Sequence, residues 1–327
     1  MTIEIHPLEE KHLADAAALV CARYRDLRNQ LALMPSRYED PDAVLPRLRD
    51  LAGRAPGVAA IRDSQLAGFL VAYQFPDFRG KPSVYAPEWA NGAGMDDSRQ
   101  IYEALYTGLS AQWVDGGYCT HLLSLMANNR DGLEGWRWLG FGLLGADGVR
   151  DLKPIPGATA GVDVRRAGLD NLQQVTTLMG ELRKYMAEPP TFLYNEDANS
   201  AKKDEKWLAD PAHAVWLAYQ GTDAVACMVQ GPANPRASGI IRDRGTTSIV
   251  AAYTRETARN TGIATALLDQ VLAWGRAQGY ELCAVDWEPM NVLGTRFWMR
   301  HFQPVSYALV RHVDQRFAPI SEGDVHV

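Results

Sequence analysis

The two halves of this chain repeat one pattern of residues, and the repeat limits the folds open to the chain more than any other feature. Asn129 and Asn291 are each followed by a glycine three residues later and a tryptophan seven residues later, and Phe141 and Phe302 come next at nearly equal distances. A Gly-Tyr pair closes a tryptophan-containing helical stretch before each Asn. Because order and spacing persist along both halves, we predict two copies of one α+β unit.

A segment rich in proline and glycine, residues 153–161, divides the chain nearly in half. Each half then begins with a strand pattern and a helical pattern, followed by two apolar segments around a short polar turn. The second arrangement is typical of an antiparallel hairpin. We therefore predict a first domain over residues 1–152, a linker over 153–161 and a second domain over 162–327.

Composition and charge exclude several classes of protein. The 33 Lys and Arg residues against 39 Asp and Glu give a net charge of −6, which argues against a nucleic-acid partner. The longest strongly apolar run, residues 66–73, is too short to span a membrane, and the first residues lack the features of a signal peptide. The four cysteines and the histidines are spaced singly, which favours neither a disulfide framework nor a metal site. We predict a cytoplasmic protein without a metal.

A short loop with Arg and Gly follows the strand predicted over residues 248–253 and leads into a predicted helix. At such a point the free backbone N–H groups and the positive end of the helix dipole suit a pyrophosphate. Gly262 would let the ligand approach the backbone, and Arg259 would add a charge-assisted contact. The alternative is an ordinary helix start with Thr261 as the N-cap and a solvent-facing Arg.

This loop resembles the pyrophosphate loop of the GCN5-related N-acetyltransferase (GNAT) family, whose pattern is Arg/Gln-x-x-Gly-x-Gly/Ala. Arg259, Gly262 and Ala264 match that pattern. The family continues with a strand that ends in Asn and a helix with an aromatic pair, which Asn291 and Phe297-Trp298 fit.

The resemblance covers roughly residues 162–316 and, more weakly, residues 1–151. It implies a chain of the α+β class made of two tandem acyl-CoA N-acetyltransferase folds, each a mixed, mostly antiparallel twisted sheet with flanking helices. It also implies acetyl-CoA as the cosubstrate, bound in the gap between two parallel strands that splay apart. The residues implied to hold it lie at the strand end, in the loop or on the following helices: Ala252, Tyr253, Thr254, Arg259, Asn260, Thr261, Gly262, Ile263, Ala264, Thr265, Asn291 and Trp298.

In this family an acceptor amine attacks the thioester directly, so a base must take its proton, and a backbone N–H near residues 252–253 polarises the thioester carbonyl. Several amine-acetylating members carry a carboxylate five residues before the Asn, where Asp286 stands, and Glu288 shares its face of the strand. Both are candidate catalytic residues, unless they only solvate the strand end. Trp298 replaces the tyrosine that serves as the family's acid. Tyr307 or Tyr253 would have to substitute, or the thiolate leaves unaided.

An aromatic and acidic segment, residues 185–197, suits an ammonium-bearing acceptor through charge and cation–π contacts. Within it, Tyr185, Tyr194 and Glu196 are the candidate substrate-binding residues, and a solvated acidic loop is the alternative. The expected acceptor is a small-molecule or peptide primary amine.

The first half lacks the residues that carry this chemistry. Asp96 and Asp97 stand where the loop glycine should fall, and Ser124 stands at the position of Asp286. Because acidic residues repel phosphates, we predict a degenerate first copy and an N-acetyltransferase site in the second half.

Two other functions remain open from the residues alone. The replacement of the family's tyrosine by Trp298 would suit an acyl-CoA-binding sensor or regulator without catalysis. Residues 140–145 spell Gly-x-Gly-x-x-Gly, the fingerprint of an NAD(P)-binding oxidoreductase, although no apolar strand precedes them.

Overall fold

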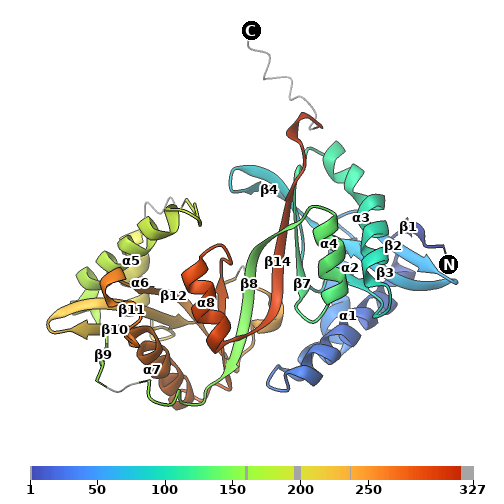
Figure 1. Ribbon diagram of the computed structural model, residues 1–327. Coiled ribbons are helices and arrows are strands. Elements are labelled where there is room, and N and C mark those ends of the chain that lie inside the picture. Colours follow the sequence, from blue (N-terminus) through green and yellow to red (C-terminus); the bar gives the residue numbers. More distant parts are fainter. Residues whose placement is uncertain (1, 159–160, 195–199, 236, 318–327) are drawn as a thin grey trace, which may run out of the picture. The chain divides into compact units, whose positions relative to one another are not determined.

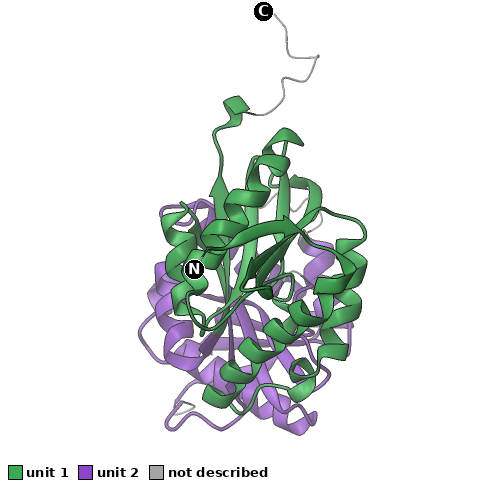
Figure 2. Ribbon diagram, turned by 90° about the vertical axis from the view of Figure 1, so that its right-hand side faces the viewer, with its two compact units in different colours: residues 1–146, 238–240, 305–327 green, residues 147–237, 241–304 purple. Residues whose placement is uncertain are grey.

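A computed structural model describes residues 2–158, 161–194, 200–235 and 237–317, and the chain packs into two compact units (Figures 1 and 2). Unit 1 contains residues 1–146, 238–240 and the segment from 305 onward, and unit 2 contains residues 147–237 and 241–304. These units do not follow the midpoint of the sequence, because the last strand of the second half belongs to unit 1. The domain boundaries that we predicted from the repeat, 1–152 and 162–327, therefore remain a prediction.

Unit 1 contains two sheets, with the strand orders β1-β2-β3-β6 and β4-β5-β7-β14, and β8 lies next to β14. β2 and β3 form the predicted antiparallel hairpin, β5 and β7 are parallel, and β14 pairs antiparallel with β7 from Ser306↔Met126 to His312↔Thr120. The elements are β1 (Glu4–Pro7), α1 (Glu10–Gln30), α2 (Pro41–Ala52), β2 (Gly57–Arg62), β3 (Gln65–Val71), β4 (Tyr73–Phe78), β5 (Lys81–Ala86), β6 (Asn91–Ala93), α3 (Ser98–Asp115), β7 (Thr120–Met126), α4 (Arg130–Trp138), β8 (Gly142–Asp151) and β14 (Gln303–His312), with a 3-10 turn at Ser36–Glu39.

Unit 2 is one mixed sheet in which the order is β13-β12-β11-β10-β9. Only β12 and β13 run parallel in this set. The elements are β9 (Asp163–Arg166), α5 (Leu172–Ala187), α6 (Ser200–Ala209), β10 (Ala214–Gln220), β11 (Asp223–Gly231), β12 (Thr246–Thr254), α7 (Ile263–Ala277), β13 (Leu282–Trp287) and α8 (Val292–His301), with 3-10 turns at Leu169–Asn171, Gly239–Ile241 and Glu256–Ala258.

Helices cover both faces of the unit 2 sheet, with α5 and α6 on one side and α7 on the other (Figure 1). Cys227 and Val229 of β11 pack in the cluster formed with α5. The central strand β11 is therefore buried on both faces, and it reads as a continuous apolar run rather than as an alternating one. The predicted hairpin of the second half is confirmed as β10 and β11.

The repeated Asn and Gly residues form matching helix starts. The Asn129 side chain accepts a hydrogen bond from the Gly132 N–H at 3.0 Å, and Asn291 accepts one from Gly294 at 3.1 Å. A Cβ on either glycine would lie only 2.7 Å from its Asn side chain. The spacing therefore serves as an N-cap at the start of α4 and again at α8. The predicted α+β class is confirmed, although the first half has the strands β4, β5 and β6 between its hairpin and α3, where the second half has only β12 before α7.

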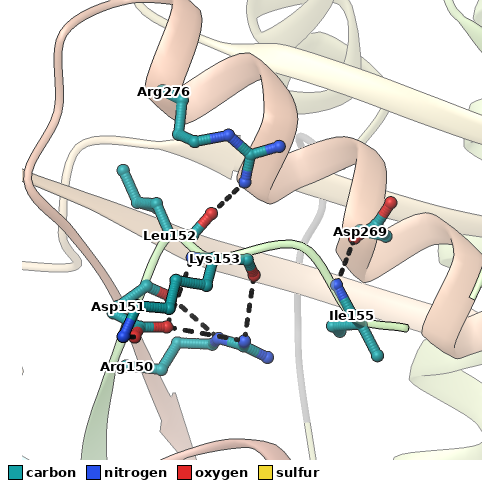
Figure 3. Close-up of polar contacts among 7 residues, drawn as sticks. All are labelled: Arg150, Asp151, Leu152, Lys153, Ile155, Asp269 and Arg276. Atoms are coloured by element: carbon teal, nitrogen blue, oxygen red, sulfur yellow. Dashed lines mark hydrogen bonds and ion pairs between the residues drawn. The ribbon is translucent and has the colours of Figure 1, made fainter.

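The segment after β8, at the start of the predicted linker, is fixed to α7 (Figure 3). The Ile155 N–H donates to Asp269 Oδ1 at 2.7 Å, and the Arg276 guanidinium donates to the carbonyl of Leu152. Leu152 and Ala158 of this segment are also buried, so both hydrogen bonds and apolar contacts hold it.

The glycines at 140–145 lie between a helix and a strand. α4 ends at Trp138, Gly140 adopts a φ of +84°, and β8 begins at Gly142. A dinucleotide fingerprint must follow a strand and open a helix. The oxidoreductase alternative is therefore wrong, because this segment has the reverse order of elements.

In the described part of the chain, no helix has both the length and the apolar character needed to cross a membrane.

Candidate functional site

The two parallel strands of unit 2, β12 and β13, are paired over only part of their length. Their pairing runs from Thr246↔Leu282 to Ile249↔Val285 and stops there, although β12 continues to Thr254. On its other side β12 stays paired with β11, and a register shift leaves Val250 as the extra residue of a bulge. Beyond Ile249 the edge of β12 that faces β13 thus offers backbone N–H and C=O groups to an extended ligand.

The chain leaves β12 through a short turn and enters α7 at a left-handed glycine. Gly262 is the N-cap of α7, with φ +85° and ψ −5°, and a Cβ built on it meets no atom within 4 Å. The Thr261 hydroxyl donates instead to the Ala258 carbonyl at 2.7 Å. The alternative in which Thr261 caps the helix is therefore wrong. The first N–H groups of α7 have no partner within the helix.

A cleft of about 530 Å³ lies over this loop and over the fork, the point after Ile249 and Val285 where the pairing of β12 with β13 ends. It gathers residues from α5, β11, β12, the loop, α7 and α8, which are far apart in the sequence. Eleven of the twelve predicted cofactor residues line it, all except Thr261. Its lining is Leu182, Tyr185, Cys227, Met228, Ala252, Tyr253, Thr254, Ala258, Arg259, Asn260, Gly262, Ile263, Ala264, Thr265, Leu267, Asn291, Leu293, Gly294, Arg296, Phe297, Trp298 and Arg300.

The charged groups in this lining are all positive. Arg259, Arg296 and Arg300 contribute guanidinium groups, and no carboxylate is among the lining residues. The positive end of the α7 dipole adds to them. In a chain with a net charge of −6, this cleft is a local site for a ligand that carries several negative charges.

Tyr185 connects three walls of the cleft. The Arg259 guanidinium lies over its ring at 4.9 Å from the centroid, and its hydroxyl donates to Asn291 Oδ1 at 3.1 Å. The Tyr253 ring lies 6.4 Å away, centroid to centroid. On the same face of α5, Glu181 forms a bidentate ion pair with Arg255, in which Nε donates to Oε2 at 2.9 Å and Nη2 donates to Oε1 at 2.8 Å. We predicted Tyr185 as a substrate-binding residue, and the structure places it against the loop that leads into α7.

Tyr253 is the tyrosine nearest to the fork in the described lining. Burial, followed by the nearby Glu181 carboxylate, raises the pKa of its phenol above the ordinary value. The phenol is therefore protonated at neutral pH, and Arg259 hydrogen-bonds to it.

Trp298 and Asn291 line the cleft with structural roles of their own. The Trp298 side chain is 8% exposed and packs edge-on against Phe297 and Phe302, with ring centroids 4.9 and 5.6 Å away. Asn291 caps α8 through Oδ1, and its Nδ2 points to the Met186 sulfur at 3.5 Å. Both side chains thus form part of the wall of the cleft.

The two candidate carboxylates lie just beyond the fork. Asp286 is the first residue of β13 after the last pair with β12, and the Asn234 amide donates to its Oδ2 at 3.4 Å. Glu288 follows the end of β13, where its carbonyl accepts from the Asn291 N–H at 3.0 Å. Both side chains are half-buried, and neither is among the residues that line the cleft.

Two further predicted residues, Tyr194 and Tyr307, do not line the cleft. Tyr307 lies half-buried on β14 in unit 1, where burial raises its pKa. Tyr194 is 77% exposed, and Glu196 falls outside the described residues. Their predicted roles stay predictions.

Unit 1 contains the counterpart of this site in closed form. Asp97, the N-cap of α3, has a left-handed φ of +58°, as Gly262 has at α7. The Asp131 carboxylate accepts from the Arg99 N–H at 2.8 Å, and so takes one of the free donors at this helix start. Arg23 of α1 reaches the Ser98 hydroxyl at 3.3 Å. A cavity of about 10 Å³ lies beside Arg23, and neither Asp97 nor Ser98 lines it.

Sequence reasoning missed Arg296 and Arg300, the two cationic residues on α8. Their spacing of four residues, after an Asn already recognised as a helix start, was the signal available. That spacing indicates a shared face of the helix, but not that the face borders the cleft. In the described part of the chain, no three His, Cys, Asp or Glu side chains gather as metal ligands would.

Comparisons with known proteins agree with this geometry. Residues 179–301 match the model of the acetyltransferase (GNAT) family, so this part of the chain is a GNAT domain. A solved structure of a GCN5-related N-acetyltransferase from Sphaerobacter thermophilus has a TM-score of 0.52 and 15% identity, over 97% of this chain and 96% of that one. The likeness shows that the chain shares that fold along nearly its whole length.

Two further structures are less similar. A GCN5-related N-acetyltransferase from Kribbella flavida has 14% identity and a TM-score of 0.36, over 97% of this chain and 72% of that one. AAC(6')-Iy in complex with the bisubstrate analogue CoA-S-monomethyl-acetylneamine has 18% identity and a TM-score of 0.36, over 43% of this chain and 89% of that one. No curated protein sequence matches the chain.

Proposed function

We propose that this protein transfers an acetyl group from acetyl-CoA to a primary amine, and that the reaction takes place in unit 2. The observation that carries the proposal is the cleft in which a split pair of parallel strands meets the open N-terminus of α7. The ligand chemistry fits the donors present: N–H groups and Arg259 for a pyrophosphate, and the free edge of β12 for the amide-bearing pantetheine arm. The match of residues 179–301 to the GNAT family supports the same assignment.

The acceptor amine must lose a proton when it attacks the thioester carbonyl, and we assign Asp286 as the group that takes it. Its position one residue beyond the last β12–β13 pair places it next to the fork. The Asn234 amide donates to Asp286 Oδ2 at 3.4 Å and so orients this carboxylate. Glu288 is the second candidate. Backbone N–H groups near Ala252 would polarise the carbonyl, which is the main electrostatic contribution in acyl transfer.

For the departing thiolate, Tyr253 is the proton donor that this structure favours over Tyr307. Tyr253 lines the cleft and its raised pKa keeps it protonated, whereas Tyr307 belongs to unit 1. A thiolate is also a good leaving group without assistance, because its pKa is modest.

The proposal is tested by the release of free thiol from acetyl-CoA with a panel of primary amines. We expect amine-dependent release, a fall of about 100-fold in kcat for Asp286→Asn at neutral pH, and a smaller change for Glu288→Gln, the second candidate. Full activity of Asp286→Asn across the pH range would show that another group is the base. Binding of acetyl-CoA without release with any amine would favour the sensor instead.

A further inference from the structure

Arg296 and Arg300 on α8 form a second positively charged group in the cleft, in addition to Arg259 in the loop before α7. They lie four residues apart on α8, so they share one face of the helix, and both line the cleft. Both side chains are exposed, and neither has a hydrogen-bond or ion-pair partner among the described residues. By contrast, Arg255 at the same end of the unit is fully paired with Glu181. Two guanidinium groups without a carboxylate, on one helix face of a cleft, suit a dianion.

A pyrophosphate already finds donors at the start of α7, so we assign the arginine pair on α8 to a second anionic group. The N–H groups of α7 and Arg259 belong to the loop after β12, while the arginine pair belongs to α8 after β13. A ligand that lies across both must carry negative charge in two places. Coenzyme A does so: it has a pyrophosphate and, on the ribose, a separate 3′-phosphate monoester.

We propose that Arg296 and Arg300 bind the 3′-phosphate of coenzyme A, and that they make the cleft select coenzyme A over its 3′-dephosphorylated form. The inference rests on the proposed function, since it assumes an acyl-CoA in the cleft. Leu293 and Phe297 alternate with the two arginines along the same stripe of α8 and also line the cleft. They offer apolar contact to the purine attached to that ribose. An ammonium-bearing acceptor would be repelled by the pair, so the acceptor enters elsewhere.

The test is a calorimetric titration of the full chain with coenzyme A and with 3′-dephospho-coenzyme A. The wild type should bind coenzyme A at least tenfold more tightly, because hydrogen bonds to a charged group contribute that much or more. The variant Arg296→Gln/Arg300→Gln should bind both ligands equally, with the affinity that the wild type has for the dephosphorylated one. Arg244→Gln removes an exposed charge of unit 2 outside the cleft and should leave the preference unchanged.

The outcomes separate the inference from the function on which it rests. If the double variant keeps the wild-type preference for coenzyme A, the arginine pair is not the 3′-phosphate site, while the proposed function stands. If the wild type binds neither ligand, the proposed function itself is wrong. Unchanged binding of 3′-dephospho-coenzyme A by the double variant shows that it is folded, so a lost preference cannot be attributed to unfolding.

Discussion

The guanidinium of Arg259 lies 4.9 Å above the centre of the Tyr185 ring, in the cleft of unit 2. The hydroxyl of the same tyrosine donates to Asn291, the N-cap of α8, at 3.1 Å. One side chain of α5 thus holds the charge at the start of α7 and the cap of α8. Because Arg259 has no carboxylate partner among the residues that the structure describes, this stacking fixes its position without neutralising its charge.

Replacing Tyr185 by leucine should weaken acetyl-CoA binding with little effect on the chemical step. A cation–π contact is worth about 1 kcal/mol, so we expect KM for acetyl-CoA to rise about fivefold while kcat changes little. Tyr185→Phe keeps the ring and loses only the bond to Asn291, so it should rescue most of the effect. Steady-state kinetics with acetyl-CoA varied will show this. A fall in kcat alone would instead assign Tyr185 to the acceptor amine.

Gly262→Ala should abolish tight binding of acetyl-CoA. The methyl group would enter the open space in front of the first N–H groups of α7, and a left-handed backbone with a Cβ costs about 1–2 kcal/mol. Gly221→Ala is the matched control, because Gly221 also has positive φ, +61°, and open space, but lies in the β10–β11 turn. We expect similar losses of stability in thermal unfolding and a tenfold or larger loss of affinity only for Gly262→Ala. Equal affinities of the two variants would contradict a phosphate at this loop.

The chain should bind one coenzyme A, not two. In unit 1 the Asp131 carboxylate already occupies a donor at the start of α3, and Asp97 adds a second negative charge there. A phosphate at this point would meet repulsion rather than free N–H groups. Calorimetry should give a stoichiometry of one for the wild type. A second equivalent that survives in Gly262→Ala would locate a site in unit 1 and refute the degenerate copy.

Unit 1 should lose stability in mild acid because of His121. Burial lowers the pKa of this imidazole to about 4, while Tyr106 and the Tyr118 carbonyl hold its two nitrogens at 2.7 and 2.8 Å. The unfolded chain takes up the proton near pH 6.5, so the stabilisation is present above that pH and is lost as pH falls toward 4. The loss is on the order of 3 kcal/mol. Urea unfolding of the wild type and His121→Gln from pH 7 to pH 4 measures it. The difference between them should shrink with falling pH, and a constant difference would contradict the assignment.

Much of the site could be predicted because its parts are local. The loop from Arg259 to Ala264 forms a turn and a helix start within a few residues, with positive φ at Asn260 (+62°) and at Gly262 (+85°). The role of Thr261 was open from the sequence, since a hydroxyl before a helix suits both a cap and a turn. Its bond to Ala258 settled the choice in favour of the turn.

The residues that line the cleft from α5 and α8 could not be assigned in the same way. Tyr185 is separated from Arg259 and Asn291 by more than seventy residues, and its acidic neighbours suggested an amine ligand. The periodicity of α8 indicates that Arg296 and Arg300 share a face, but the neighbour of that face depends on how the strands before it diverge.

The sequence by itself determined the hairpins, the helix starts at Asn129 and Asn291 and the left-handed turn at Gly262, because each depends on hydrogen bonds or side-chain spacing within about ten residues. Only the tertiary structure decided that β14 pairs with β7 in unit 1, and that residues of α5, α7 and α8 line one cleft in unit 2. Both outcomes depend on contacts between segments far apart in the chain. Such contacts follow from how strands and helices pack, which local spacing does not specify.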